Sequence, residues 1–104
     1  METILFIDTT NNKEVTVTLR IDGKDFIKIQ PLDTRKAQVV LPMMEELLRE
    51  HDLQLKDLSE IEVNPGPGSF TGTRVGLSIA NALGFLLQIP VNGRKVGESV
   101  EAVY

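Results

Sequence analysis

The sequence reads Asn64-Pro65-Gly66-Pro67-Gly68-Ser69-Phe70-Thr71-Gly72 between a short β-branched run, Ile61 to Val63, and a long apolar segment. Proline fixes the backbone angle φ, whereas glycine permits dihedrals and close approaches that a Cβ atom would forbid. A segment that carries two prolines and three glycines is therefore restrained to one shape. The layout predicts a strand, a rigid structural turn and the start of a helix, and such a turn suits a ligand, a partner backbone or a domain junction.

The composition indicates one globular domain of 104 residues, with 41% hydrophobic and 25% charged residues. The net charge of −4 argues against a nucleic-acid-binding surface, because such surfaces are usually basic, so contact with RNA is expected only through a partner. The absence of cysteine fits a cytoplasmic protein. The N-terminus lacks the basic region of a signal peptide, and Val75 to Leu87 is shorter than the roughly 20 residues of a membrane span. We therefore expect no membrane association.

The apolar pattern predicts an α/β fold with the order β-β-β-α-β-α-β. Ile4 to Ile7 has no alternation, as in a central strand, and Val15 to Ile21 alternates before Asp22-Gly23 and Phe26 to Ile29, which indicates a β-hairpin. Ile61 to Val63 forms a fourth strand, and Pro90 to Asn92 a short fifth one. Crossover connections that contain helices would make the later strands parallel to the first, so we expect a mixed five-stranded sheet.

A first helix is expected from Ala37, with Asp33 or Thr34 as its N-cap. Pro42 either kinks this helix or marks its true start. Its predicted core face comprises Ala37, Val40, Leu41, Met44, Leu47 and Leu48. The second helix should run from Gly72 or Thr73 to Leu87.

The second helix has an apolar arc far broader than the stripe of about 100° that covers a sheet. One side holds Gly76, Ala80, Leu83 and Leu87, and the adjacent side holds Val75, Ile79, Ala82 and Leu86. Gly76, Ala80 and Gly84 form a ridge of small residues that permits close approach of another helix. Either the second side packs on the first helix of the same domain, or both helices face another protein. Val39 and Met43, off the predicted core face of the first helix, favour the partner.

The polar residues of the turn leave a ligand site open as an alternative. The glycine turn and the following helix would bind an anion, with Asp8, Thr10, Gly66 and Gly68 as the ligand-binding residues. The run is not a Walker motif, since no lysine follows the glycines. Asp8 would equally cap its turn, and Ser69 and Thr71 are interpreted as turn and cap hydroxyls. With one histidine, His51, and no cysteine, no metal site is predicted.

Several motifs together resemble the bacterial TsaB family, over about residues 3 to 93. They are Ile7-Asp8-Thr9-Thr10, Val40-Leu41-Pro42 with Leu47-Leu48, the run from Gly66 to Gly72 before Arg74 and Gly76, and Ile89-Pro90-Val91. The resemblance implies a ribonuclease-H-like lobe of the actin-like ATPase superfamily, in a glycoprotease-like family that is tied to threonylcarbamoyladenosine formation in tRNA.

What the resemblance implies is a non-catalytic subunit without a cofactor of its own. Family members pair, through the two helices of the N-terminal lobe, with a larger catalytic paralogue, TsaD, and the ATPase subunit of the complex is a further candidate partner. In isolation the same surface would support a homodimer. The expected interface residues are Val39, Met43, Arg74, Gly76, Ala80, Leu83, Gly84 and Leu87.

The chain departs from the family pattern in three places. Residues 1–93 are expected to form the N-terminal lobe and 94–104 a C-terminal tail, with the family's second lobe absent. A histidine is usual where this chain reads Arg35-Lys36-Ala37, and glycine is frequent at Ala82. The alternative function is an ATP- or phosphate-binding lobe. A peptidase is a weaker hypothesis, because Ser69 or Ser78 would need a base and the single histidine, His51, is too remote to supply it.

Overall fold

A computed structural model describes residues 1–31 and 36–103, without the side chains of Lys36 and Ala37. The predicted N-cap at Asp33 or Thr34 lies outside the described residues. The elements follow the order β1, β2, β3, α1, a short 3-10 helix η1 (Leu55–Asp57), β4 and α2.

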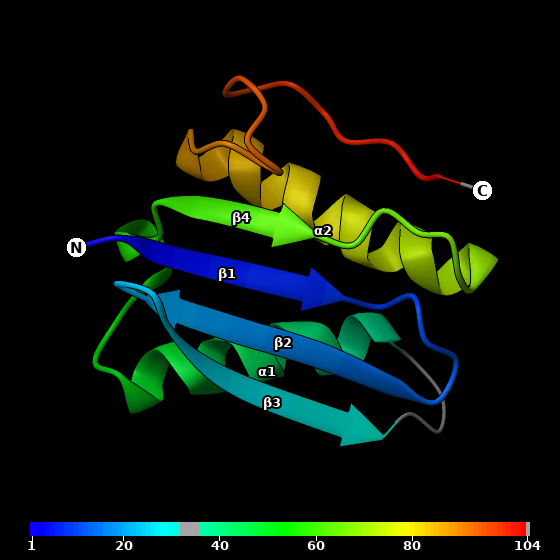
Figure 1. Cartoon of the computed structure of the whole chain (residues 1–104), viewed down its shortest axis with the longest axis horizontal. Helices are drawn as coiled ribbons and strands as arrows, with labels where there is room; N and C mark the ends of the chain where they lie inside the picture. Colours follow the sequence, from blue (N-terminus) through cyan, green and yellow to red (C-terminus); the bar gives the residue numbers. More distant parts are fainter. Residues whose placement is uncertain (32–35, 104) are drawn as a thin grey trace.

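The four strands form one mixed sheet with the order β3-β2-β1-β4 (Figure 1). They are β1 (Thr3–Asp8), β2 (Glu14–Ile21), β3 (Lys24–Pro31) and β4 (Glu60–Val63). β1 is antiparallel to β2 and parallel to β4, and β2 is antiparallel to β3. Asp22 and Gly23 join β2 and β3 with φ angles of 48° and 86°, as tight hairpin turns require. The predicted hairpin and mixed α/β fold are confirmed.

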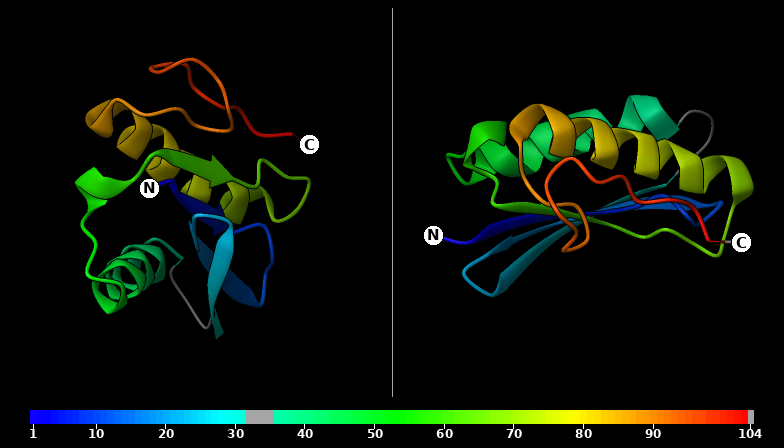
Figure 2. Two further views of the ribbon diagram at one scale, coloured as in Figure 1. Left: turned by 60° about the vertical axis from the view of Figure 1, so that its left-hand side comes forward. Right: turned by 90° about the horizontal axis from the view of Figure 1, so that it is seen from above.

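The helices α1 (Lys36–Glu50) and α2 (Phe70–Leu87) lie on the same side of the sheet (Figure 2). Alternate residues of the strands point toward them, since successive side chains of a strand face opposite sides. The fully buried apolar core consists of Leu5, Ile7, Val15, Val17, Leu19, Val40, Ile61 and Ala80, with Met44 and Leu47 almost as deeply buried. The helices therefore close the core on one face and leave their outer faces to solvent.

The predicted fifth strand is wrong. Val91 forms a single parallel bridge with Ile61, in which Ile61 donates to the carbonyl of Pro90 at 3.0 Å. The Asn92 side chain then bonds the N–H and carbonyl of Val63 at 2.7 and 3.0 Å. The backbone cannot continue along β4 because Asn92 and Gly93 turn it with φ angles of 53° and 71°.

Two assignments on α1 are also wrong. Met43, placed off the core face, is 3% exposed, whereas Leu41, placed on it, is 51% exposed. At about 100° per residue, Met43 lies about 60° to one side of Val40, and Leu41 lies about 100° to the other side. The core stripe is centred on Val40, so it includes Met43 and excludes Leu41. Pro42 lies inside the helix and does not mark its start.

The segment after Gly93 runs beside α2 without forming a helix or strand (Figures 1 and 2). The Asn81 side chain bonds both the N–H and the carbonyl of Val100 at 2.9 Å. Val103 donates its N–H to the carbonyl of Pro65 at 2.7 Å. The segment thus contacts both α2 and the glycine turn.

Candidate functional site

The glycine turn is packed against two other parts of the chain. The peptide bond between Gly66 and Pro67 is cis, and Gly66 has a φ of 107°. A Cβ atom at Gly66 would collide with the carbonyl oxygen of Val103. A Cβ atom at Gly68 would lie 2.6 Å from the Cβ and 2.7 Å from the carbonyl oxygen of Thr10. Both positions therefore require glycine because neighbouring backbone comes too close for any side chain.

The structure brings together the four residues predicted as ligand-binding. Asp8 accepts the N–H and hydroxyl of Thr10 on Oδ1, at 2.9 and 2.7 Å. It accepts the Asn64 amide on Oδ2 at 3.1 Å. Asn64 in turn accepts the N–H of Gly66 at 3.1 Å, and Thr10 accepts the N–H of Ser69 at 2.8 Å. These bonds join the ends of β1 and β4 to the turn.

This network gives every one of its polar groups an intramolecular role. Asp8 caps the turn after β1, as one of the two readings of the sequence had it. Among residues 1–31 and 36–103, no group of three or more His, Asp or Glu residues is placed to hold a metal ion. The arrangement can therefore fix the shape of the turn, and phosphate or ATP binding by Asp8, Thr10, Gly66 and Gly68 stays a prediction.

The turn fixes the beginning of α2. Ser69 is the N-cap, and its hydroxyl accepts the N–H of Gly72 at 3.2 Å, which satisfies one of the free donors of the first turn. Its role as a cap hydroxyl is as predicted, while Thr71 is exposed. The Arg74 guanidinium lies 4.3 Å from the centre of the Phe70 ring, a favourable cation–π geometry. The helix begins at Phe70, two or three residues earlier than predicted.

The ridge of small residues faces the interior of the domain. Gly76 packs on Thr9, Gly84 packs on Val91, and Ala80 is fully buried. Close approach at this ridge is therefore used within the domain, by the loop after β1 and the segment after α2. Gly76, Ala80, Gly84 and the buried Met43 have no surface to offer a partner. Leu83 and Leu87 are half-buried and pack against the core, as does Val39.

The side of α2 adjacent to this ridge is also apolar and is partly exposed. It carries Val75, Ile79, Ala82 and Leu86, which recur at helical spacing, and we call these four residues the outer stripe. Ala82 and Leu86 are exposed, whereas Val75 and Ile79 are half-buried and Ile79 packs against the core. Leu86 is 73% exposed. Phe70, which was predicted only as part of the turn, and Phe85, which was not predicted as a site residue, are also exposed on α2. Phe85 could have been predicted from the sequence, because it is an aromatic residue of this helix that lies outside the small-residue ridge.

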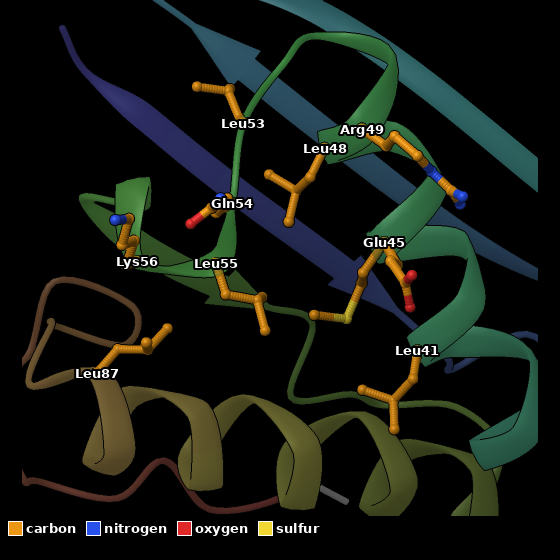
Figure 3. A pocket seen from close by; sticks show the side chains of 10 residues that line it. Leu41, Glu45, Leu48, Arg49, Leu53, Gln54, Leu55, Lys56 and Leu87 are labelled. Carbon is orange, nitrogen blue, oxygen red and sulfur yellow. The ribbon is translucent and has the colours of Figure 1, made fainter.

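An apolar groove of about 610 Å³ lies between α1, η1 and the C-terminal end of α2. Figure 3 shows Leu41 of α1, Leu55 of η1 and Leu87 of α2 facing the space between these elements. Leu41 and Leu55 are 51% and 40% exposed. The charged residues that line the groove are Glu45, Arg49 and Lys56. The groove continues the apolar surface of α2 toward α1.

Charged side chains tie the edge strand β3 to α1 and β2. Lys28 bonds Glu50 at 2.9 Å and Glu46 at 3.1 Å, and these hydrogen bonds raise the pKa of Lys28. Arg20 bonds Asp25 at 2.7 Å, which lowers the pKa of Asp25. These groups belong to the sheet and α1, and they stabilise the sheet on which the helices pack.

His51 lies at the end of α1, where Nδ1 is 2.9 Å from the carbonyl of Leu47 and the ring is 4.1 Å from that of Phe26.

By length and composition α2 is apolar enough to cross a membrane. In this fold its small residues are buried against the sheet, as in a core helix.

Comparison with known proteins agrees with the architecture. The family model TsaD, described as tRNA N6-adenosine threonylcarbamoyltransferase, matches residues 29–94, which is more than half of the chain. The TsaB protein of Bacillus subtilis, a tRNA threonylcarbamoyladenosine biosynthesis protein, is 36% identical over 96% of this chain and 44% of its own length. The TsaB protein of Escherichia coli is 33% identical over 86% of this chain and 38% of its own length.

The solved structure of YeaZ from Pseudomonas aeruginosa superposes with a TM-score of 0.83 at 33% identity, over 91% of this chain and 44% of that one. The chain thus spans less than half the length of these relatives. Sequence and fold agree over nearly all of it, and the chain belongs to the TsaB family.

Proposed function

We propose that this chain is a non-catalytic partner subunit of the complex that forms threonylcarbamoyladenosine in tRNA, docking through α1 and α2 on the catalytic, TsaD-like paralogue. The observation that supports the proposal is the partly exposed outer stripe of α2, which is apolar although Ala82 and Leu86 are exposed to solvent. Contiguous exposed apolar surface is typical of a protein-binding site.

The docking surface combines the outer stripe with the groove between the helices. The groove supplies apolar walls, and Glu45, Arg49 and Lys56 supply a charged lining. Protein interfaces have this composition, with an apolar centre and a polar rim. Leu86, Leu41 and Leu55 would lose solvent-accessible area on docking, and each buried Å² of apolar area contributes about 25 cal/mol.

The choice of a TsaD-like occupant rests on the relatives. Those matched over most of this chain are named as threonylcarbamoyladenosine biosynthesis proteins, and the family model that matches is that of the threonylcarbamoyltransferase. A second copy of the chain would cover the same apolar helices in the absence of the paralogue. The non-catalytic role is supported by the bonding of Asp8, Thr10 and Asn64 to one another.

The proposed function predicts complex formation and stimulation. When the chain and the TsaD-like protein of the same organism are purified separately and mixed, we expect them to elute together from a sizing column. We also expect the chain to increase threonylcarbamoyl transfer to tRNA in a reconstituted assay, while the chain alone transfers nothing. Separate elution together with unchanged transfer rates would refute the proposal. Sedimentation of the chain alone tests whether it forms a homodimer in the absence of the paralogue.

A phosphate-binding lobe is the second candidate, favoured by the meeting of Asp8, Thr10, Gly66 and Gly68 at the carboxyl ends of the neighbouring parallel strands β1 and β4. Titration calorimetry with ATP and magnesium separates the two candidates. Because the turn already binds the Thr10 backbone through Ser69, we expect no heat of micromolar binding. Micromolar binding that Asp8→Asn abolishes would favour the phosphate-binding lobe.

A further inference from the structure

The buried hydroxyl of Thr9, directly after β1, forms hydrogen bonds with two backbone groups in one turn of α2. Thr9, which is fully buried, donates its hydroxyl to the carbonyl of Gly72 at 2.6 Å. The same oxygen accepts the N–H of Gly76 at 3.0 Å. Gly72 and Gly76 are an i, i+4 pair of the helical ladder. A side chain more than 60 residues away in sequence is therefore attached to the backbone of α2 rather than to its side chains.

Gly76 makes this attachment possible. A Cβ atom there would lie 2.5 Å from the Thr9 hydroxyl oxygen, closer than van der Waals contact allows. Thr9 is itself held between Asp8 and Thr10, which bond each other at 2.7 Å, and Thr10 accepts the N–H of Ser69. The hydroxyl thus has a fixed position relative to both the sheet and the helix.

Apolar burial alone does not determine how α2 is rotated on the sheet. The inward ridge and the outer stripe are both apolar, and the helix lacks acidic or basic residues in its terminal turns apart from Arg74 near its start. A rotation of about 100° in one sense, equivalent to one residue, would turn the outer stripe toward the sheet in place of the inward ridge and would still bury apolar residues. Hydrogen bonds are directional, so such a rotation would break both bonds to Thr9.

We infer that Thr9 is a positioning residue that sets the rotation and height of α2 on the sheet and thereby determines that the outer stripe faces the partner. The second half of this inference rests on the proposed function, and the first half does not. Thr9 acts through the α2 backbone and contacts no partner itself, since its side chain is fully buried.

The test compares two buried threonines that differ in bonding. Thr73 on α2 is 1% exposed, like Thr9 at 0%, but its hydroxyl has no hydrogen-bond partner in the described part of the chain. Thr9→Val and Thr73→Val each replace one hydroxyl by a methyl group of the same shape. Thr9→Ser keeps the hydroxyl and serves as the rescue variant. All three are made in the full chain.

Amide exchange and NMR contacts measure the position of α2. In Thr9→Val we expect the Gly76 amide to exchange about tenfold faster, because the loss of a buried hydrogen bond has about this effect on local opening. We also expect the through-space contacts between Gly84 and Val91 to change. Thr9→Ser and Thr73→Val should retain the exchange rate and contacts of the parent chain. Equal behaviour of Thr9→Val and Thr73→Val would overturn the inference.

Should Thr9→Val fail to fold, Thr9→Ser decides the question. Normal Gly76 protection in the folded serine variant supports the role of the hydroxyl, and loss of protection there overturns it.

Affinity for the TsaD-like paralogue is then measured for the folded variants. We expect about tenfold weaker binding by Thr9→Val and unchanged binding by Thr73→Val, in line with a lost hydrogen bond. If the exchange results hold but even the parent chain does not bind, the proposed function fails while the positioning role stands. If the parent binds and Thr9→Val binds equally well, the role in presenting the outer stripe is overturned.

Discussion

Gly68→Ala is expected to destabilise the fold by about 3 kcal/mol, the upper part of the range for a group forced into filled space. The added Cβ atom would meet the Cβ of Thr10 at 2.6 Å and its carbonyl oxygen at 2.7 Å. A flexible side chain would move aside, but this oxygen belongs to the backbone and accepts the N–H of Ser69. The turn and the loop after β1 must therefore separate, which removes the attachment of α2's start.

Urea denaturation followed by circular dichroism measures this effect, with Gly97→Ala as the control. Gly97 has a φ of 88° and no atom within 4 Å of an added Cβ, so the control contains the strain of a positive φ but no collision. That strain costs roughly 1 kcal/mol. A loss in Gly68→Ala no greater than that in Gly97→Ala would contradict the packing described for the turn.

Leu86→Glu is expected to weaken binding to the TsaD-like paralogue about 100-fold, because a charge would be buried at the centre of the interface. Leu86 is 73% exposed in the free chain, so the substitution should leave the free energy of unfolding nearly unchanged. Loss of affinity without loss of stability is the result that distinguishes a docking residue from a core residue.

Ile27→Glu is the matched control. Ile27 lies on β3, is 60% exposed, and pairs with Thr18 on the face of the sheet turned away from the helices. It offers the same change of chemistry at similar exposure and is expected to bind the paralogue normally. Affinity is measured by titration at concentrations where both variants are folded. Equal affinities for the two variants would place the interface elsewhere.

Local sequence signals predicted the parts of the fold that depend on neighbouring residues. The Asp22-Gly23 hairpin, the uninterrupted apolar run of β1 and the restrained turn from Pro65 to Gly72 all have their cause within a few residues. The fifth strand failed for a local reason as well, since Asn92 and Gly93 adopt positive φ angles that an apolar count does not reveal.

The orientation of α2 could not be predicted from its sequence. A helical wheel shows which residues share a side, but both sides of this helix are apolar, so the wheel does not tell which side meets the sheet. Gly76 and Gly84 were assigned to a partner although Thr9 and Val91 occupy their surfaces. On α1 the helical wheel likewise placed Leu41 on the core face and Met43 off it, whereas Met43 is buried and Leu41 is exposed.

The meeting of Asp8, Thr10 and the turn was predictable from topology, because the carboxyl ends of adjacent parallel strands lie at one edge of a sheet. The role of Thr9 was not. This role depends on hydrogen bonds to residues 63 and 67 positions away, which no spacing in the sequence predicts.

In the proposed complex the catalytic paralogue covers the outer faces of α1 and α2. Hydrogen exchange of the chain with and without this protein, read by mass spectrometry, measures which peptides become covered. We predict slower exchange in peptides that cover 41–56 and 70–87, and no change in 15–29 on β2 and β3. Protection confined to 15–29, or no protection while a complex is present, would show that the paralogue does not dock on α1 and α2.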